Sequence, residues 1–166
     1  MTVSIRYGLI TVALIILQTT FVRFVSIENV TPDILLVWIA YLALRHGQIH
    51  ATVAGFILGF IMDIISGNFL GLSALSKTVC GFVGGYFFDE EKTDQTLATY
   101  RFAIIVLIGA LVHNLIYFSI FVQGSDFPFF RTIIFFGVTT SLYTSALSLL
   151  PILGYSRVRG DRVLPR

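Results

Sequence analysis

Residues 49–88 read IHATVAGFILGFIMDIISGNFLGLSALSKTVCGFVGGYFF, two apolar runs that meet at a short glycine-containing turn. A helix needs about 20 mainly apolar residues to cross the roughly 30 Å of hydrocarbon in a bilayer. The runs 49–65 and 69–88 are close to that length. This stretch therefore predicts a hairpin of two membrane-spanning helices.

Four more apolar segments flank this hairpin, so the sequence predicts six crossings. The predicted helices cover residues 7–25, 31–47, 49–66, 69–88, 102–122 and 133–154. The second is the weakest, because its uninterrupted apolar run from Ile34 to Leu44 would extend only about 16 Å. In this interpretation Asp33 and Arg45 mark its two water boundaries, and Pro32 lies at the helix start. Without this helix the chain would cross five times.

Composition excludes most other classes of protein. Of the 166 residues, 56% are hydrophobic and 12% are charged, whereas soluble domains have about 25% charged residues. Too few polar groups remain to cover a soluble enzyme of this size. The net charge of +2 makes nucleic acid a poor partner. We therefore expect an all-α integral membrane protein, with residues 1–166 forming one six-helix domain.

Lysine and arginine are unevenly divided between the two sides of the predicted bundle. Cytoplasmic loops carry an excess of these residues, which predicts that both termini are cytoplasmic. Five crossings would exchange Arg6 for Arg23 and leave only the C-terminus cytoplasmic. The two residues on the outer side are Arg23 and Arg131, and the eight on the inner side are Arg6, Arg45, Lys92, Arg101, Arg157, Arg159, Arg162 and Arg166.

Small residues recur every four positions on both helices of the central hairpin. In lipid, such stripes let two helix backbones approach closely. Pairing positions 51 with 85, 55 with 81, 59 with 77 and 63 with 73 centres the turn on Asn68. The predicted helix-packing residues are Ala51, Gly55, Gly59, Ser73, Gly81 and Gly85.

Asp63 and Lys77 are ionisable residues inside this hairpin. Ionisable groups in a bilayer are costly, so each is a functional hypothesis by default. The pairing above separates them by about one helical turn, which a lysine stem can bridge, and predicts a structural Asp63–Lys77 ion pair. The alternative is that Lys77 snorkels to the surface while Asp63 lies at the interface. Neither arrangement implies catalysis.

The remaining polar residues do not predict a reaction. His113 and Asn114, in the fifth helix, indicate hydrogen bonding between helices. His46 and His50 are four residues apart but lack a nearby third metal ligand. No Ser–His–acid spacing and no phosphate-binding glycine loop occurs in the sequence. We expect no catalytic residue, no cofactor and no metal.

Residues 31–88 contain, in order, TPDILL (31–36), YLALRHG (41–47), GFILGFIMDIISG (55–67), LGLSAL (70–75) and Gly81. This series of motifs resembles the MreD family of bacterial rod shape-determining proteins. It places Pro32, Asp33, Gly67 and Gly71 among the motif residues. Lys77 is not part of that pattern.

This resemblance implies a six-helix fold similar to the substrate-binding subunits of energy-coupling-factor transporters. It also implies a non-enzymatic scaffold in the bacterial inner membrane that binds the bitopic protein MreC and helps to organise peptidoglycan synthesis. Through MreC, such a protein would meet the MreB filament, RodA and a class B penicillin-binding protein.

The residues leave a second function open. A substrate-binding membrane subunit of a small-molecule (vitamin) transporter needs a few convergent polar groups around a cavity. The candidates for such a site are Asp63, Lys77, His113, Asn114 and Arg131.

Overall fold

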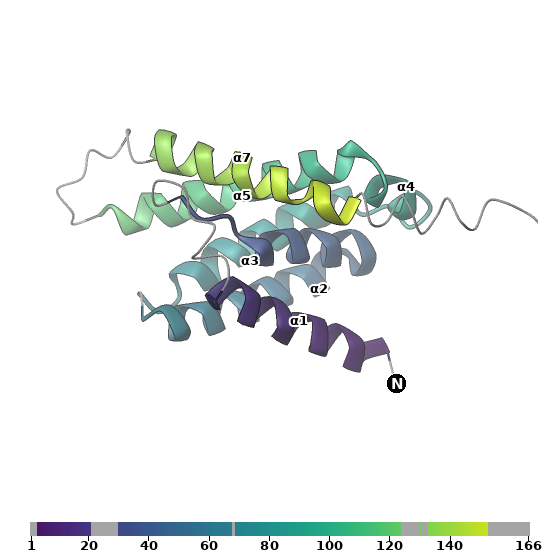
Figure 1. Cartoon of the computed structure of the whole chain (residues 1–166), viewed down its shortest axis with the longest axis horizontal. Helices are drawn as coiled ribbons and strands as arrows, with labels where there is room; N and C mark the ends of the chain where they lie inside the picture. The colour runs from purple at the N-terminus through teal and green to yellow at the C-terminus, as the bar shows by residue number, and fades with distance from the viewer. Residues whose placement is uncertain (1–2, 21–29, 68, 124–129, 131–132, 153–166) are drawn as a thin grey trace, which may run out of the picture.

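The computed structural model describes residues 3–20, 30–67, 69–123, 130 and 133–152, and its helices run roughly side by side (Figure 1). In order they are α1 (Val3–Thr20), α2 (Ile34–Ser66), α3 (Leu72–Gly84), the 3₁₀ turn η2 (Gly85–Phe87), α4 (Thr93–Leu97), α5 (Tyr100–Phe121), the π-helical η3 (Ile133–Gly137) and α7 (Val138–Leu147). Within the described residues, three helical stretches are long and apolar enough to cross a membrane, namely Ile34–Ser66, Tyr100–Phe121 and Ile133–Ile152.

Several predicted features cannot be compared with the structure. Outside the described residues lie the predicted helix ends at 21–25 and 153–154, the turn centre Asn68, and the charged residues Arg23, Arg131, Arg157, Arg159, Arg162 and Arg166.

Helix α2 is itself a hairpin, because the chain reverses at Gly47. The backbone of Gly47 has φ 81°, in the left-handed region that favours glycine. Ala43 and Ala51, on either side of it, both contact the same end of α3. A Cβ on Gly84 would lie 3.2 Å from the Ala43 Cβ, and one on Gly81 would lie 2.3 Å from the Ala51 carbonyl oxygen. We call residues 34–46 the first arm and residues 48–66 the second arm.

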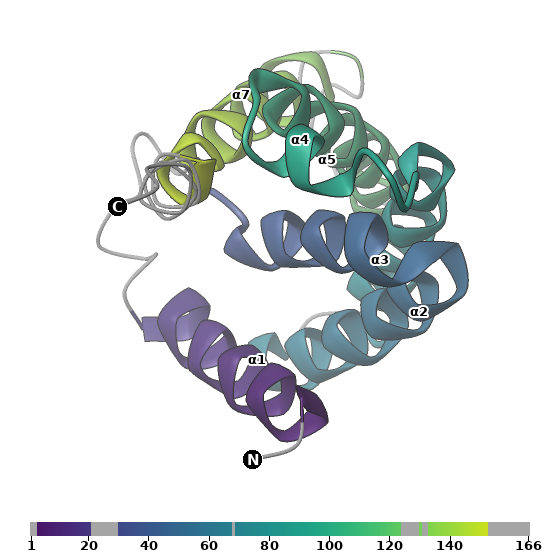
Figure 2. The same ribbon diagram turned by 90° about the vertical axis from the view of Figure 1, so that its right-hand side faces the viewer.

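The first arm is the centre of the molecule. Figure 2 shows the other helices as an open ring around it, with the opening between α1 and α7. Its apolar side chains pack against α5 on one side and against the second arm and α3 on the other. The first-arm residues with at most 1% of their surface exposed are Leu35, Leu36, Ile39, Ala43 and Leu44.

The second arm and α3 pack with their backbones in contact. A Cβ on Gly55 would lie 2.3 Å from the Lys77 carbonyl oxygen, and one on Gly59 would lie 2.3 Å from that of Ser73. The small residues predicted for this interface therefore lie in it, but the predicted register is wrong by one helical turn. Gly55 faces residue 77 rather than 81, and Gly85 lies against Gln48 rather than against residue 51.

The two ends of the bundle are distinct. At one end, the Gly67 end, the second arm turns into α3; at the other, the α4 end, Arg45 of the first arm pairs with Asp94 at 3.0 Å. Helices α1 and α7 both have their outer ends there. The ring of Tyr7 lies 5.0 Å from that of His46, and Ile152 belongs to the core cluster that contains Leu44 and Leu97.

Exposed charges at the α4 end interact locally. Lys92 donates to Asp89 at 2.9 Å, and this hydrogen bond lowers the pKa of the Asp89 carboxyl. The Thr93 hydroxyl donates to the Leu44 carbonyl oxygen at 2.8 Å. Helix α4 is therefore attached to the end of the first arm by the hydrogen bond from Thr93 to Leu44 and by the ion pair between Arg45 and Asp94.

Candidate functional site

The first arm begins at a partly buried position, between the fully buried Pro32 and Leu35. Its N-cap is Asp33, whose carboxylate accepts an ion pair from Lys77. Lys77 is five residues beyond the start of α3 at Leu72, which corresponds to a depth of about 7–8 Å along that helix. Asp33 was expected at the water boundary; its side chain is 16% exposed and, with the exposed Thr31, lines a cavity. Pro32 precedes the cap rather than occupying the first helical turn, and it is fully buried.

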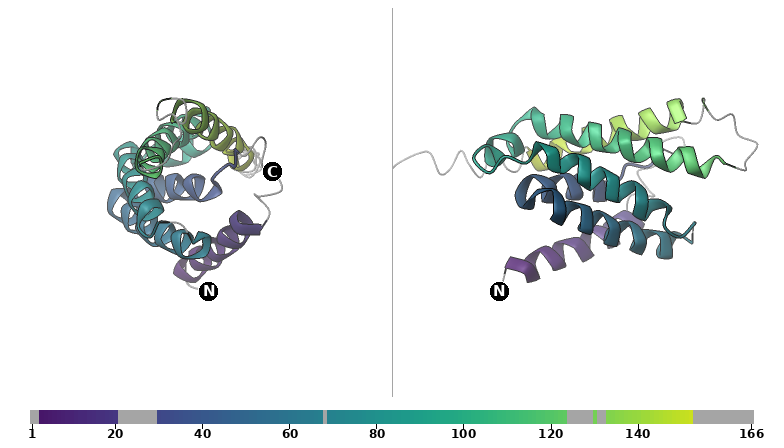
Figure 3. Two further views of the ribbon diagram at one scale, coloured as in Figure 1. Left: turned by 90° about the vertical axis from the view of Figure 1, so that its left-hand side faces the viewer. Right: turned by 180° about the vertical axis from the view of Figure 1, so that it is seen from behind.

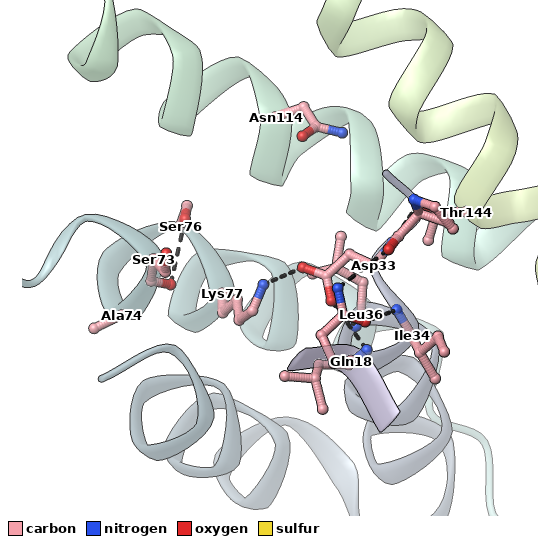
Figure 4. Close-up of polar contacts among 12 residues, drawn as sticks. Gln18, Asp33, Ile34, Leu36, Ser73, Ala74, Ser76, Lys77, Asn114 and Thr144 are labelled. Carbon is pink, nitrogen blue, oxygen red and sulfur yellow. Dashed lines mark hydrogen bonds and ion pairs between the residues drawn. The ribbon is translucent and has the colours of Figure 1, made fainter. Parts of the chain in front are cut away.

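Side chains satisfy all the free N–H groups at this buried helix start. The first N–H groups of a helix have no partner within it, and in an apolar environment each unpaired group is costly. Figure 4 shows how α1, α2 and α7 converge here. The four hydrogen bonds are Asp33 N–H to Thr144 Oγ1 (3.0 Å), Ile34 N–H to Gln18 Oε1 (2.9 Å), and Leu35 and Leu36 N–H to Asp33 Oδ1 (3.0 and 3.3 Å).

Lys77 pairs with Asp33, so the ion pair predicted between Lys77 and Asp63 is wrong. The Lys77 side chain is 4% exposed and its Nζ contacts Asp33 Oδ2. A buried cation needs a counter-ion because desolvation of an isolated charge is strongly unfavourable. The alternative in which Lys77 snorkels to the surface is also wrong, because burial leaves its ammonium group inside the bundle.

Asp63 caps helix α3 instead. It is fully buried, and its carboxylate accepts hydrogen bonds from the backbone N–H groups of Gly71 (2.9 Å), Ser73 (3.0 Å) and Ala74 (3.2 Å). The N-cap of α3 is Gly71, which has no side chain to do this. The one-turn change in register explains the exchange, since it moves Asp63 from the side of α3 to its N-terminus.

The two turn glycines have backbone conformations that favour glycine. Gly67 has φ 66° and Gly71 has φ 95°, and L-residues with a side chain rarely adopt such angles. Gly67 ends the second arm and donates its N–H to the Asp63 carbonyl oxygen. These positions of the family motif therefore shape the turn that holds the Asp63 cap.

Helices α5 and α7 are joined by a second buried polar cluster. Asn114 donates to Ser141 Oγ at 2.9 Å and to the Gly137 carbonyl oxygen at 3.4 Å. The neighbouring His113 is 6% exposed, and its Nδ1 has no hydrogen-bond partner within the described part of the chain. The sequence indicated the role of Asn114. It did not indicate Thr144, because a threonine among many on one helix carries no signal of its own.

Two recesses lie on either side of the start of the first arm. One, the polar cavity, has a volume of about 560 Å³ and is lined by side chains that include Gln18, Asp33, Lys77, His113 and Asn114. The other, the apolar groove, has a volume of about 530 Å³, and its lining includes residues of α1 and α7, the two helices whose ribbons are set apart in Figure 3. The groove is lined by Ile10, Leu14, Leu17, Ile34, Val37, Trp38, Tyr41, Leu97, Phe102, Leu147, Leu150 and Pro151.

None of these features forms a metal centre. Across the described ranges, no group of three or more His, Cys, Asp or Glu residues could hold a metal ion. His46 and His50 lie close together, with their rings 6.1 Å apart, but His50 Nδ1 lies 2.8 Å from the His46 carbonyl oxygen. Asp63 and Lys77 were both candidates for a site that binds a transported ligand, but they do not pair with each other: Lys77 pairs with Asp33, and Asp63 caps α3.

Comparison with known families decides the identity of the chain. The family model of the rod shape-determining protein MreD matches residues 2–153. The chain belongs to the MreD family. A search of curated proteins and a search of solved structures gave no match. Membership of the MreD family gives the chain a role in rod shape determination, as a membrane protein of a family not known for enzymatic activity.

Proposed function

We propose that this MreD-family chain is a non-enzymatic scaffold of the bacterial cell-elongation machinery, which binds an MreC-like bitopic protein and helps to organise peptidoglycan synthesis. Through that partner it would associate with the MreB filament, RodA and a class B penicillin-binding protein. The single observation that supports a binding role is the apolar groove between α1 and α7. In the described residues, Ile34, Trp38 and Tyr41 of the first arm line this groove and are partly exposed.

We further propose six crossings of the inner membrane with both termini in the cytoplasm, in an arrangement similar to energy-coupling-factor substrate-binding subunits. The length of the first arm supports this number. Its 13 residues from 34 to 46 extend about 20 Å, and the four non-helical residues 30–33 can add about 13 Å. Together they match the roughly 30 Å of a bilayer core.

The groove suits a single transmembrane helix of the partner. Its lining residues come from α1, the first arm, the end of α4, the start of α5, and the end of α7 with the residues that follow it, and all of them are apolar or aromatic. Lipid provides no hydrophobic force between helices, so association there depends on close packing of complementary shapes. A groove that follows one side of a central helix offers that packing along about two turns, from Ile34 to Tyr41. An MreC-like protein has one transmembrane helix to place in it.

Filling the groove should abolish partner binding. Ile10 and Leu17 line the groove from α1, whereas Val12 and Ile16 are 55% and 56% exposed and do not line it. We expect Ile10→Trp and Leu17→Trp to reduce co-purification of the MreC-like partner from detergent at least tenfold. The matched controls Val12→Trp and Ile16→Trp should co-purify like the unmodified protein. Equal recovery with both pairs would show that the partner binds elsewhere.

A further inference from the structure

We infer that the polar cavity is a binding site for a small uncharged molecule with an apolar body and a carboxamide-like head. The cavity reaches the Gly67 end of the molecule, because Ser66 at the end of α2 and Phe121 and Val122 at the end of α5 are part of its lining. Its volume of about 560 Å³ is within the range of about 300–1,000 Å³ typical of small-molecule sites. Helices α1, α2, α3, α5 and α7 contribute side chains to it.

The first observation is an unpartnered buried nitrogen. His113 is 6% exposed and lines the cavity, and its Nδ1 makes no hydrogen bond to any described residue. Almost all buried polar side-chain atoms in proteins have a hydrogen-bond partner. Every other buried side-chain nitrogen or oxygen in the described ranges has one. A ligand group in the cavity would complete the hydrogen bonding of His113.

The second observation is a buried cation with unused donors. The Lys77 ammonium group carries three N–H donors, and its described contact is the single one to Asp33 Oδ2. Lys77 is part of the cavity lining. An acceptor such as a carbonyl oxygen can therefore bind Lys77 without displacing Asp33.

Charge and shape specify the rest of the ligand. Lys77 and Asp33 already neutralise each other, so a charged ligand would bring an uncompensated charge into a poorly solvated space. An uncharged amide offers an oxygen to Lys77 and an N–H to His113. The α5 side of the cavity is aromatic: the rings of His113 and Tyr117, and of Tyr117 and Phe121, are stacked with centroids 5.8 Å apart. This surface suits a flat apolar body.

The test uses three probes that share one ring: benzamide, benzoate and toluene. Cys80 is the only cysteine of the chain and is 3% exposed, so a thiol-reactive dye reports unfolding directly. A ligand that binds only the folded state raises the unfolding temperature. In nanodiscs of one zwitterionic lipid, we expect millimolar benzamide to raise that temperature saturably, and benzoate and toluene to raise it less.

Two variants locate the effect in the cavity. Thr140 lines the cavity, whereas its neighbour Thr139 is exposed and does not. Thr140→Phe should abolish the benzamide shift, and Thr139→Phe should retain it. His113→Phe should reduce the shift at least to that of toluene by removing Nδ1.

Some outcomes would overturn the proposal. These are no benzamide shift beyond that of toluene in the unmodified protein, or an unchanged shift in Thr140→Phe. The pair of threonine variants decides the question even where His113→Phe does not fold. The scaffold proposal is tested by co-purification with variants of the apolar groove, whose substituted residues do not line the cavity. The two proposals can therefore fail separately.

Discussion

The residue that organises this protein is Asp33, because its carboxylate has two roles at once. One oxygen accepts the N–H groups of Leu35 and Leu36, and the other pairs with Lys77. Asp63 has the corresponding role at the start of α3, but there with backbone partners alone. Two carboxylates therefore begin two helices, and of these two only that of Asp33 is paired with a lysine among the described residues.

The Asp33–Lys77 pair should show strong coupling. Removing one member of a buried ion pair leaves an uncompensated charge and typically costs about 3–5 kcal/mol. We expect Asp33→Asn, which can still cap the helix, and Lys77→Met each to lower the unfolding temperature in detergent. The double variant should unfold at a higher temperature than the worse single variant. Additive effects of the two changes would contradict the pairing.

At the scale of elements, the closest packing is that of the second arm on α3. The glycines of this interface have no room for a methyl group, since a Cβ at Gly55 would lie 2.3 Å from a backbone oxygen. An added methyl group would push the two helices apart as rigid bodies, because neither backbone can relax locally around it. The register of the hairpin therefore determines where Asp63 and Lys77 lie.

Gly55→Ala should separate these helices, whereas Gly8→Ala should not disturb α1. A Cβ on Gly8 would have no atom within 4 Å. Overpacking of this kind typically costs about 1–3 kcal/mol, while glycine to alanine in an open helical position is neutral or stabilising. We expect a lower unfolding temperature for Gly55→Ala only. Similar unfolding temperatures for the two variants would show that the interface tolerates a methyl group.

The sequence predicted the helices of this hairpin but not their register. Small residues recur every four positions on both helices, so sliding one helix by a turn matches them equally well. The hydrogen-bonding demand of the free N–H groups at α3 decides between the two registers, and that demand is not visible in residue spacing. The partners at the start of the first arm were missed for a similar reason. Hydropathy treats Asp33 as a boundary and cannot show that Lys77, Gln18 and Thr144 bind there.

For the whole molecule, the six-crossing arrangement predicts where reporter fusions function. The outer ends of α1 and α7 lie at the α4 end with Arg45 and Lys92, and positively charged loops stay in the cytoplasm. A fluorescent protein at either terminus should therefore fluoresce, and alkaline phosphatase inserted in the Gly67–Gly71 turn should be active. Phosphatase activity in an N-terminal fusion would support five crossings instead.

The buried start of the first arm has a consequence for the order of membrane insertion. Asp33 leaves the ribosome 44 residues before the lysine that neutralises it. Until that lysine arrives, the short apolar run after Asp33 has a bare carboxylate at one end and little length to hold it in lipid. We therefore expect the final placement of this run to follow the synthesis of Lys77, out of the order in which the chain is made.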